Sequence, residues 1–337
     1  MRTPRLLCLL AIALSGSLLL IAQDSEYILK LDVPLVSLDI QVEDPATGRA
    51  VTSLTREDFT VFEDGKRQEI RNFSSADTPY NILVMLDCTG SIRNQWTFLR
   101  NATDRFAQSV RPQDRIAIVA FGAGTKVLRD WTTRNELNLN MNVPANDPIC
   151  DDTDFYQAMS WASEQMRKID GRKGVLVLSD GVHEHIPRGF VNFGGLAQTR
   201  FIDAAGDRDF QTSLRAARTS GAAFYFVAVN TDLNPAAVSD LLHPAVDYSP
   251  TAVFNMQQVR MRMELLARDS GGRIVFPKSP ADYAPLFGRI GVELGTSYSI
   301  GYAPPNPSDP LRHVIEVQVN DKRLIIRQSR DSYHVQP

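Results

Sequence analysis

The sequence predicts an α/β domain, a mostly parallel sheet covered by helices, flanked by a small β module built from both ends of the chain. Three observations predict this fold. Apolar strands alternate with amphipathic helices between residues 80 and 296, which is typical of parallel sheets. Residues 27–73 and 298–327 alternate with period two, as antiparallel strands do. Two central strands end in an acidic residue, at Asp87 and Asp180.

Size and composition set the class of protein. A length of 337 residues is typical of about two domains. An apolar fraction of 43% with 22% charged residues indicates a soluble globular chain. The formal net charge is −3 and no basic run occurs, so we expect no nucleic-acid partner.

The N-terminus has the pattern of a secretory signal. Arg2 and Arg5 precede an apolar segment from Leu6 to Ala22, and polar residues follow. We expect a signal peptide at 1–22 and a protein that is secreted, periplasmic or held in the cell envelope. An uncleaved membrane anchor is the alternative, because Leu20 occupies a position before the cleavage site where a small residue is preferred. No later segment has the roughly 18 apolar residues that span a bilayer, so we expect no membrane span after cleavage.

The first β segment, expected at 23–78, contains two alternating runs at 35–42 and 58–63. Turn residues at 44–48 and 63–66 predict hairpins after each run.

The α/β domain is expected at 79–296. Its predicted strands are 82–87, 115–121, 126–131, 175–178, 223–229 and 273–276, with 126–131 antiparallel to 115–121. Its predicted helices are 97–110, 155–166, 210–218 and 259–268. In the first helix, Phe98, Ala102, Phe106 and Val110 share one face.

The C-terminal segment, expected at 297–337, returns to strands at 298–302, 313–319 and 324–327. The short turn 320–322 predicts a hairpin between the last two strands. Because so few strands cannot bury a core alone, we expect them to complete the N-terminal module as one β-sandwich-like unit.

Oxygen ligands for a metal ion follow three of the predicted elements. Asp87, Thr89 and Ser91 lie on one turn after a buried strand, which suits a hard divalent cation. Thr153 opens the second helix, and Asp180 ends the strand 175–178. Loops at the carboxyl ends of parallel strands converge, so these residues can meet. The alternative is that Asp87 and Asp180 only cap turns.

This ordered set resembles the metal-ion-dependent adhesion site of von Willebrand factor A domains, over roughly residues 80 to 295. The resemblance implies a doubly wound, Rossmann-like sheet and a bound Mg²⁺, or Mn²⁺ or Ca²⁺. It also implies that Asp87, Ser91 and Thr153 ligate the ion, that Asp180 acts largely through water, and that Thr89 replaces the usual serine. The flanks, including Gly301-Tyr302-Ala303-Pro304, resemble the extensions of a secreted acidobacterial family of related proteins.

Two cysteines remain after signal cleavage, Cys88 in the first metal loop and Cys150 three residues before Thr153. An oxidising compartment lets them pair, and convergence of the loops would bring them within disulfide range. We predict the bridge; two unpaired, buried thiols are the alternative.

The leading functional hypothesis is a binding or adhesion module, not an enzyme, in which a protein partner supplies an acidic residue to the metal. Neither a P-loop nor a nucleophile elbow occurs. The alternatives are a metal-assisted hydrolase using Asp87 and His183, and a structural component of an envelope assembly. His183-Glu184-His185 lacks the spacing of a zinc site and is interpreted as a solvated loop.

Overall fold

The structure, a computed structural model, describes residues 35–137, 147–183, 188–193, 196–201, 203–229, 250–306, 309 and 312–334. The predicted signal segment at 1–22 lies outside these residues.

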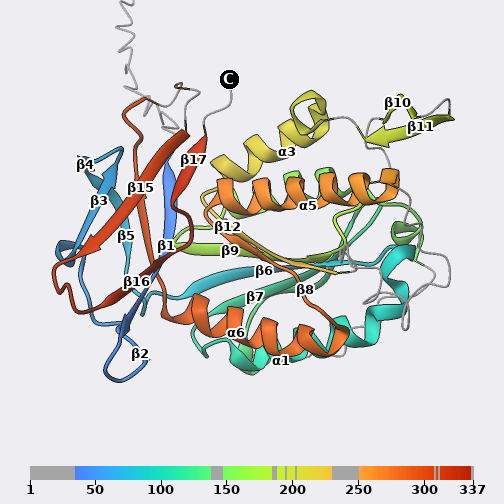
Figure 1. Ribbon diagram of the computed structural model, residues 1–337. Helices are drawn as coiled ribbons and strands as arrows, with labels where there is room; N and C mark the ends of the chain where they lie inside the picture. The colour runs from blue at the N-terminus through green and yellow to red at the C-terminus, as the bar shows by residue number, and fades with distance from the viewer. Residues whose placement is uncertain are drawn as a thin grey trace, which may run out of the picture. The chain divides into compact units, whose positions relative to one another are not determined.

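A six-stranded sheet forms the centre of the α/β domain, with strand order β13-β12-β9-β6-β7-β8 (Figure 1). All neighbours are parallel except β8, which runs antiparallel to β7 as predicted. Its strands are β6 (Tyr80–Asp87), β7 (Arg115–Phe121), β8 (Thr125–Thr133), β9 (Arg172–Ser179), β12 (Ala223–Ala228) and β13 (Arg273–Val275). From β6 the chain continues to β7 on one side and later returns to β9 on the other, so the strand order reverses there.

Helices cover both faces of this sheet. The helices α1 (Trp96–Ser109) and α6 (Tyr283–Thr296) contribute to one core, while α2 (Phe155–Arg167), α3 (Arg208–Thr219) and α5 (Pro250–Ser270) contribute to the other. In α1, Ala102 and Phe106 are buried as predicted, and so is Leu99, whereas Phe98 is 43% exposed, which corrects the predicted face at that residue. The sequence pattern missed α6. None of the helices in the described residues is long and apolar enough to span a membrane.

A short antiparallel hairpin follows β9 along the chain, formed by β10 (Arg188–Phe193) and β11 (Leu196–Phe201).

The flanking module is a sandwich of two antiparallel sheets that share one core. One sheet has the order β16-β1-β14-β5 with β2 beside β1, and the other has the order β17-β15-β3-β4. The strands of the first are β1 (Val36–Asp44), β2 (Arg49–Ala50), β5 (Ile70–Ser74), β14 (Tyr298–Tyr302) and β16 (Ile325–Gln328). Those of the second are β3 (Phe59–Glu63), β4 (Lys66–Gln68), β15 (Arg312–Val319) and β17 (Ser332–His334). N-terminal and C-terminal strands thus interleave, and the predicted fold class is confirmed.

The hairpin predicted from 313–319 and 324–327 is wrong. β15 pairs with β3 and β17, whereas β16 pairs with β1 in the opposite sheet. The short connection carries the chain across the sandwich. This arrangement lets Val317 and Val319 of β15 pack into the same core as Ile326 of β16; a flat hairpin would leave one apolar face without a partner.

A buried carboxylate joins the sandwich to the α/β domain. Asp39 of β1 accepts hydrogen bonds from the hydroxyls of Tyr80 (3.1 Å), Tyr225 (2.6 Å) and Ser299 (2.6 Å). Tyr80 and Tyr225 belong to β6 and β12, so both central strands are held to β1.

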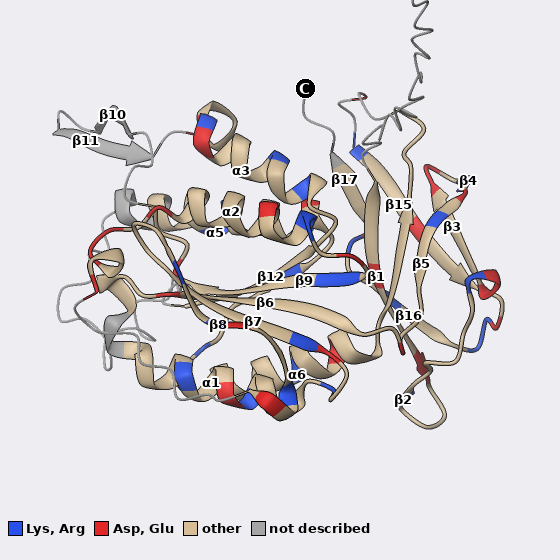
Figure 2. Ribbon diagram, turned by 180° about the vertical axis from the view of Figure 1, so that it is seen from behind, with Lys and Arg blue, Asp and Glu red and all other residues tan. Residues whose placement is uncertain are grey.

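Figure 2 shows acidic and basic residues interspersed along the ribbon. The predicted boundaries at 22, 78 and 296 stay a prediction.

Candidate metal centre

Asp87 lies at the point where the strand order of the central sheet reverses. It is the last residue of β6, and β6 pairs with β9 in parallel register, Leu86 opposite Leu178. The next residue of β9, Ser179, donates a hydrogen bond of 2.6 Å to Asp87 Oδ2. Asp180 follows immediately. The two acidic residues therefore lie at the same edge of the sheet, because neighbouring parallel strands end together.

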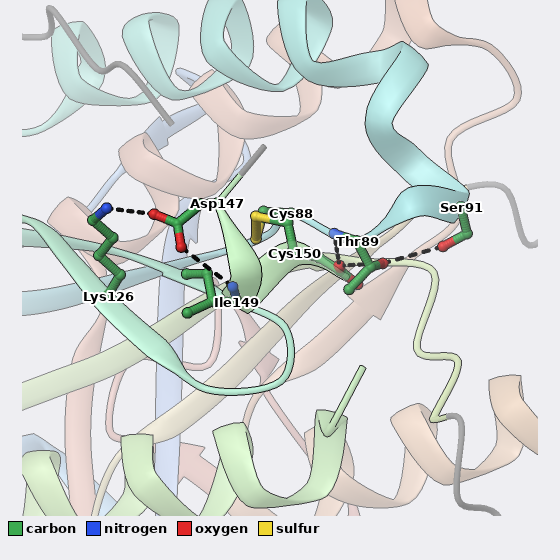
Figure 3. The surroundings of a disulfide bond; sticks show 8 residues. Cys88, Thr89, Ser91, Lys126, Asp147, Ile149 and Cys150 are labelled. Atoms are coloured by element: carbon green, nitrogen blue, oxygen red, sulfur yellow. Dashed lines mark hydrogen bonds and ion pairs between the residues drawn. A yellow bond between two sulfur atoms is a disulfide. The ribbon is translucent and has the colours of Figure 1, made fainter. Parts of the chain in front are cut away.

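The turn after β6 binds the other oxygen of Asp87. The backbone N–H and the hydroxyl of Thr89 donate to Asp87 Oδ1 over 3.0 and 2.7 Å. Thr89 Oγ1 lies 3.2 Å from Ser91 Oγ (Figure 3). A hydrogen bond from Ser91 also reaches Asp180. Asp87, Thr89, Ser91 and Asp180 thus form one connected cluster, as the sequence predicted for these four.

Burial makes the two carboxylates electrostatically costly. Asp87 is fully buried and Asp180 is 3% exposed. Burial first, and then the charge of Asp180, raises the pKa of Asp87 to about 7. Burial also raises the pKa of Asp180, against hydrogen bonds from Ser91 and the Val182 N–H that favour its charged form. Neither a lysine nor an arginine of the described residues is among the main causes of these two shifts.

Thr153 lies on a loop that the structure fixes beside the first one. The loop begins with a short helical turn, Pro148–Cys150, and ends at Asp154, which caps α2 by accepting from Gln157 N–H. Thr153 is 8% exposed, and its N–H donates to Asp152. Among the described residues, no hydrogen bond joins Thr153 to the other four predicted ligands. Its participation stays a prediction.

Backbone contacts hold this loop against the β7–β8 connection. Ala123 N–H donates to Ile149 O over 2.7 Å, and Asp154 N–H donates to Gly122 O over 2.9 Å. A Cβ at Gly122 would lie 1.9 Å from Ile149 O, so only glycine allows this approach.

A disulfide connects the two loops. Cys88 and Cys150 are bonded, with a Cα–Cα distance of 5.0 Å and a sequence separation of 62 (Figure 3). The structure therefore has the pairing that the sequence analysis predicted. The bridge ties the residue after Asp87 to the segment that carries Thr153.

His183 is buried rather than solvated, which corrects the interpretation of its loop. It is 3% exposed, its ring centroid lies 4.3 Å from that of Tyr156, and Nδ1 lies 3.7 Å from Asp154 Oδ1. Glu184 and His185 lie outside the described residues. The sequence analysis also missed Ser179, although a hydroxyl just before the strand-ending Asp180 was a visible signal.

The donor set fits a divalent cation. Two carboxylates and the hydroxyls of Thr89 and Ser91 are hard oxygen ligands of the kind that Mg²⁺, Mn²⁺ and Ca²⁺ prefer. Two buried carboxylates are costly unless a cation compensates their charges, and a divalent ion would offset both.

Comparison with known proteins agrees with this geometry. Residues 82–183 match the family model of the von Willebrand factor type A domain. No curated protein matches the chain.

Similar solved structures include the pilus adhesin SpaC of Lactobacillus rhamnosus GG in its open conformation. It has 10% identity and a TM-score of 0.47, and the match covers 83% of this chain and 43% of that one. A von Willebrand factor type A protein of Catenulispora acidiphila has 11% identity and a TM-score of 0.43, covering 82% and 72%. The PilB minor pilin of Streptococcus sanguinis has 11% identity and a TM-score of 0.39, covering 78% and 74%.

The acidobacterial resemblance of the flanks stays a prediction. The strand order, the placement of Asp87 and Asp180, and the family match over 82–183 agree. The chain therefore contains a von Willebrand factor type A domain.

Proposed function

We propose that this protein is a binding module that engages a protein partner through a divalent metal ion. Asp87, Thr89, Ser91, Thr153 and Asp180 would hold the ion, Mg²⁺ in the first instance, directly or through water. The observation that carries the proposal is the cluster of two buried carboxylates and two hydroxyls at the reversal point of the sheet.

The partner class follows from the donor set. Hydroxyl ligands donate less negative charge than carboxylates, so a bound ion would keep a coordination position attractive to an incoming acidic side chain. Ser91 is exposed whereas Asp87 is not, so the cluster opens to solvent on the Ser91 side. An aspartate or glutamate of a protein partner is the ligand that we propose for that position.

Export to the cell envelope or medium is the proposed location. The Cys88–Cys150 bridge supports it, because disulfides persist in oxidising compartments. The signal pattern at 1–22 supports it independently. An adhesive role in the envelope fits such a location.

Calorimetric titration of Mg²⁺ or Mn²⁺ into chelator-stripped protein tests the metal. We expect about one equivalent to bind, and Asp87→Ala to abolish binding. Glu164→Gln removes an exposed charge on α2 and should leave binding intact. Unchanged binding in Asp87→Ala would disprove the site.

Capture of a partner from envelope extract tests the function. Immobilised wild-type protein should retain a protein that chelator releases and that Asp87→Ala does not retain. If the captured protein stays bound in the presence of chelator and also binds to Asp87→Ala, binding does not use the metal.

A further inference from the structure

A second group of potential metal ligands lies in the sandwich module. Glu63, Asp64 and His313 each offer one ligand atom, and these atoms lie within 4.8 Å of one another. The described residues contain one such group of acidic and histidine side chains. None of its members belongs to the von Willebrand factor type A domain.

Strand pairing brings these three residues together. Glu63 ends β3 opposite Ile315 of β15. Asp64 and Gly65 form the turn to β4, with positive φ values of 49° and 75°. Two hydrogen bonds of 2.9 Å pin this turn to β15, from Asp64 N–H to Val314 O and from Val314 N–H to Asp64 Oδ1. Asp64 Oδ2 is thereby placed 2.8 Å from His313 Nδ1.

Glu63 is the unusual member. Alternate residues of β3 face the core, and Glu63 follows Phe59 and Val61 in that series, at 2% exposed. Neither of its carboxylate oxygens has a hydrogen-bond partner among the described residues. Oε1 lies 3.4 Å from His313 Nδ1. A buried carboxylate is costly unless a cation or several hydrogen bonds compensate its charge.

Two tyrosines approach Glu63 without completing this compensation. Burial, and then hydrogen bonding to Glu63 and its charge, raises the pKa of Tyr302 and of Tyr333, so both hydroxyls lie beside the carboxylate, although neither meets the full geometry of a hydrogen bond. The buried guanidinium of Arg330 donates instead to Asp269 O (2.9 Å) and Ser37 O (2.7 Å).

We propose that Glu63, Asp64 and His313 bind a divalent transition-metal ion such as Zn²⁺. One imidazole nitrogen and two carboxylate oxygens are common Zn²⁺ ligands, and tetrahedral bonds of about 2.1 Å place ligand atoms roughly 3.4 Å apart. The Nδ1–Oε1 distance of 3.4 Å already meets this spacing. The Nδ1–Oδ2 distance of 2.8 Å has to open by roughly 0.6 Å, since the ion replaces the proton between these atoms.

A metal there would link the two ends of the chain. Glu63 and Asp64 come from the N-terminal flank, and His313 comes from the C-terminal flank, 249 residues after Asp64. The ion would therefore stabilise the sandwich. This proposal does not depend on the binding function proposed above.

Zn²⁺ titration of chelator-stripped Asp87→Ala protein separates this site from the first. We expect about one equivalent to bind, and His313→Gln or Asp64→Asn, added to that background, to remove it. Asp64 is 47% exposed in its side chain, so its substitution should fold even if Glu63→Gln does not. Glu69→Gln, at an exposed acid of the same module, is the matched control and should retain binding.

Co²⁺ gives a second readout. In the Asp87→Ala background it should produce visible absorption bands of a four-coordinate or five-coordinate site, which His313→Gln abolishes. Absence of Zn²⁺ binding in that background, or binding that both ligand substitutions leave unchanged, would overturn the proposal in favour of a shared proton.

Discussion

Ser179 donates a 2.6 Å hydrogen bond to Oδ2 of Asp87, and it does so across two neighbouring parallel strands. Thr89 occupies the other oxygen of the same carboxylate. The orientation of Asp87 is therefore fixed by a side chain of the neighbouring strand β9 and by the turn that follows β6, before any ligand binds. Ser179 also accepts from the Gly181 N–H, so it positions the turn that follows Asp180.

Ser179→Ala should weaken Mg²⁺ or Mn²⁺ binding about 10-fold or more, because loss of a group that orients a ligand typically costs that much. Titration calorimetry measures the change. Ser163→Ala removes another buried hydroxyl, one that donates within α2 to Met159 O, and should leave metal affinity unchanged. Equal affinity of Ser179→Ala and wild type would show that Ser179 does not orient Asp87.

The disulfide should contribute to stability as well as to loop position. Replacing both Cys88 and Cys150 with alanine is expected to lower the free energy of unfolding by about 2–4 kcal/mol, as for other bridges that close long loops. Chemical denaturation measures it. Mass spectrometry of the non-reduced protein, alkylated without reductant, should find neither cysteine modified; two alkylated thiols would show that the bridge does not form in the protein.

The loop that carries Cys150 should respond to acid through Asp147. Its carboxylate pairs with Lys126 and accepts from Ile149 N–H over 3.2 Å (Figure 3). The Lys126 contact, and then the Ile149 N–H, lowers the pKa of Asp147. Since the folded pKa lies below the unfolded value of about 3.9, this stabilisation is present above that value and is lost as the pH falls through the folded pKa.

Thermal melts of wild type and Asp147→Asn across pH check this sign. Wild type should melt at the higher temperature near pH 6, and the difference should shrink toward zero below the folded pKa. Lys126→Met should reduce the difference near pH 6. A difference that grows on acidification would contradict the argument.

Local patterns were enough to predict much of this structure. The apolar run ending at Asp87 and the alternation of strands and helices are properties of consecutive residues. They predicted the central sheet and the four side chains that the structure brings together in the candidate site. Pairing between strands that are far apart in the sequence could not be predicted in this way. The turn at 320–322 predicted a hairpin because the sequence shows that the connection is short. It does not show in which sheet each of the two strands pairs. The burial of Glu63 was not predicted for the same reason, because it depends on pairing with β15, about 250 residues further along the chain.

The buried carboxylate of Asp39 connects the two modules, because it accepts hydrogen bonds from three hydroxyl groups. This contact leads to the last prediction. Burial, and then the Asp39 charge, raises the pKa of Tyr80 and of Tyr225, so both hydroxyls remain donors. Asp39→Asn loses the charge and should lower the free energy of unfolding by about 2–4 kcal/mol, because hydrogen bonds to a charged group are stronger than neutral ones. Tyr80→Phe removes the longest of the three bonds and should cost about 1 kcal/mol. Urea denaturation measures both, and an Asp39→Asn protein as stable as wild type would show that this carboxylate does not hold the sandwich to the α/β domain.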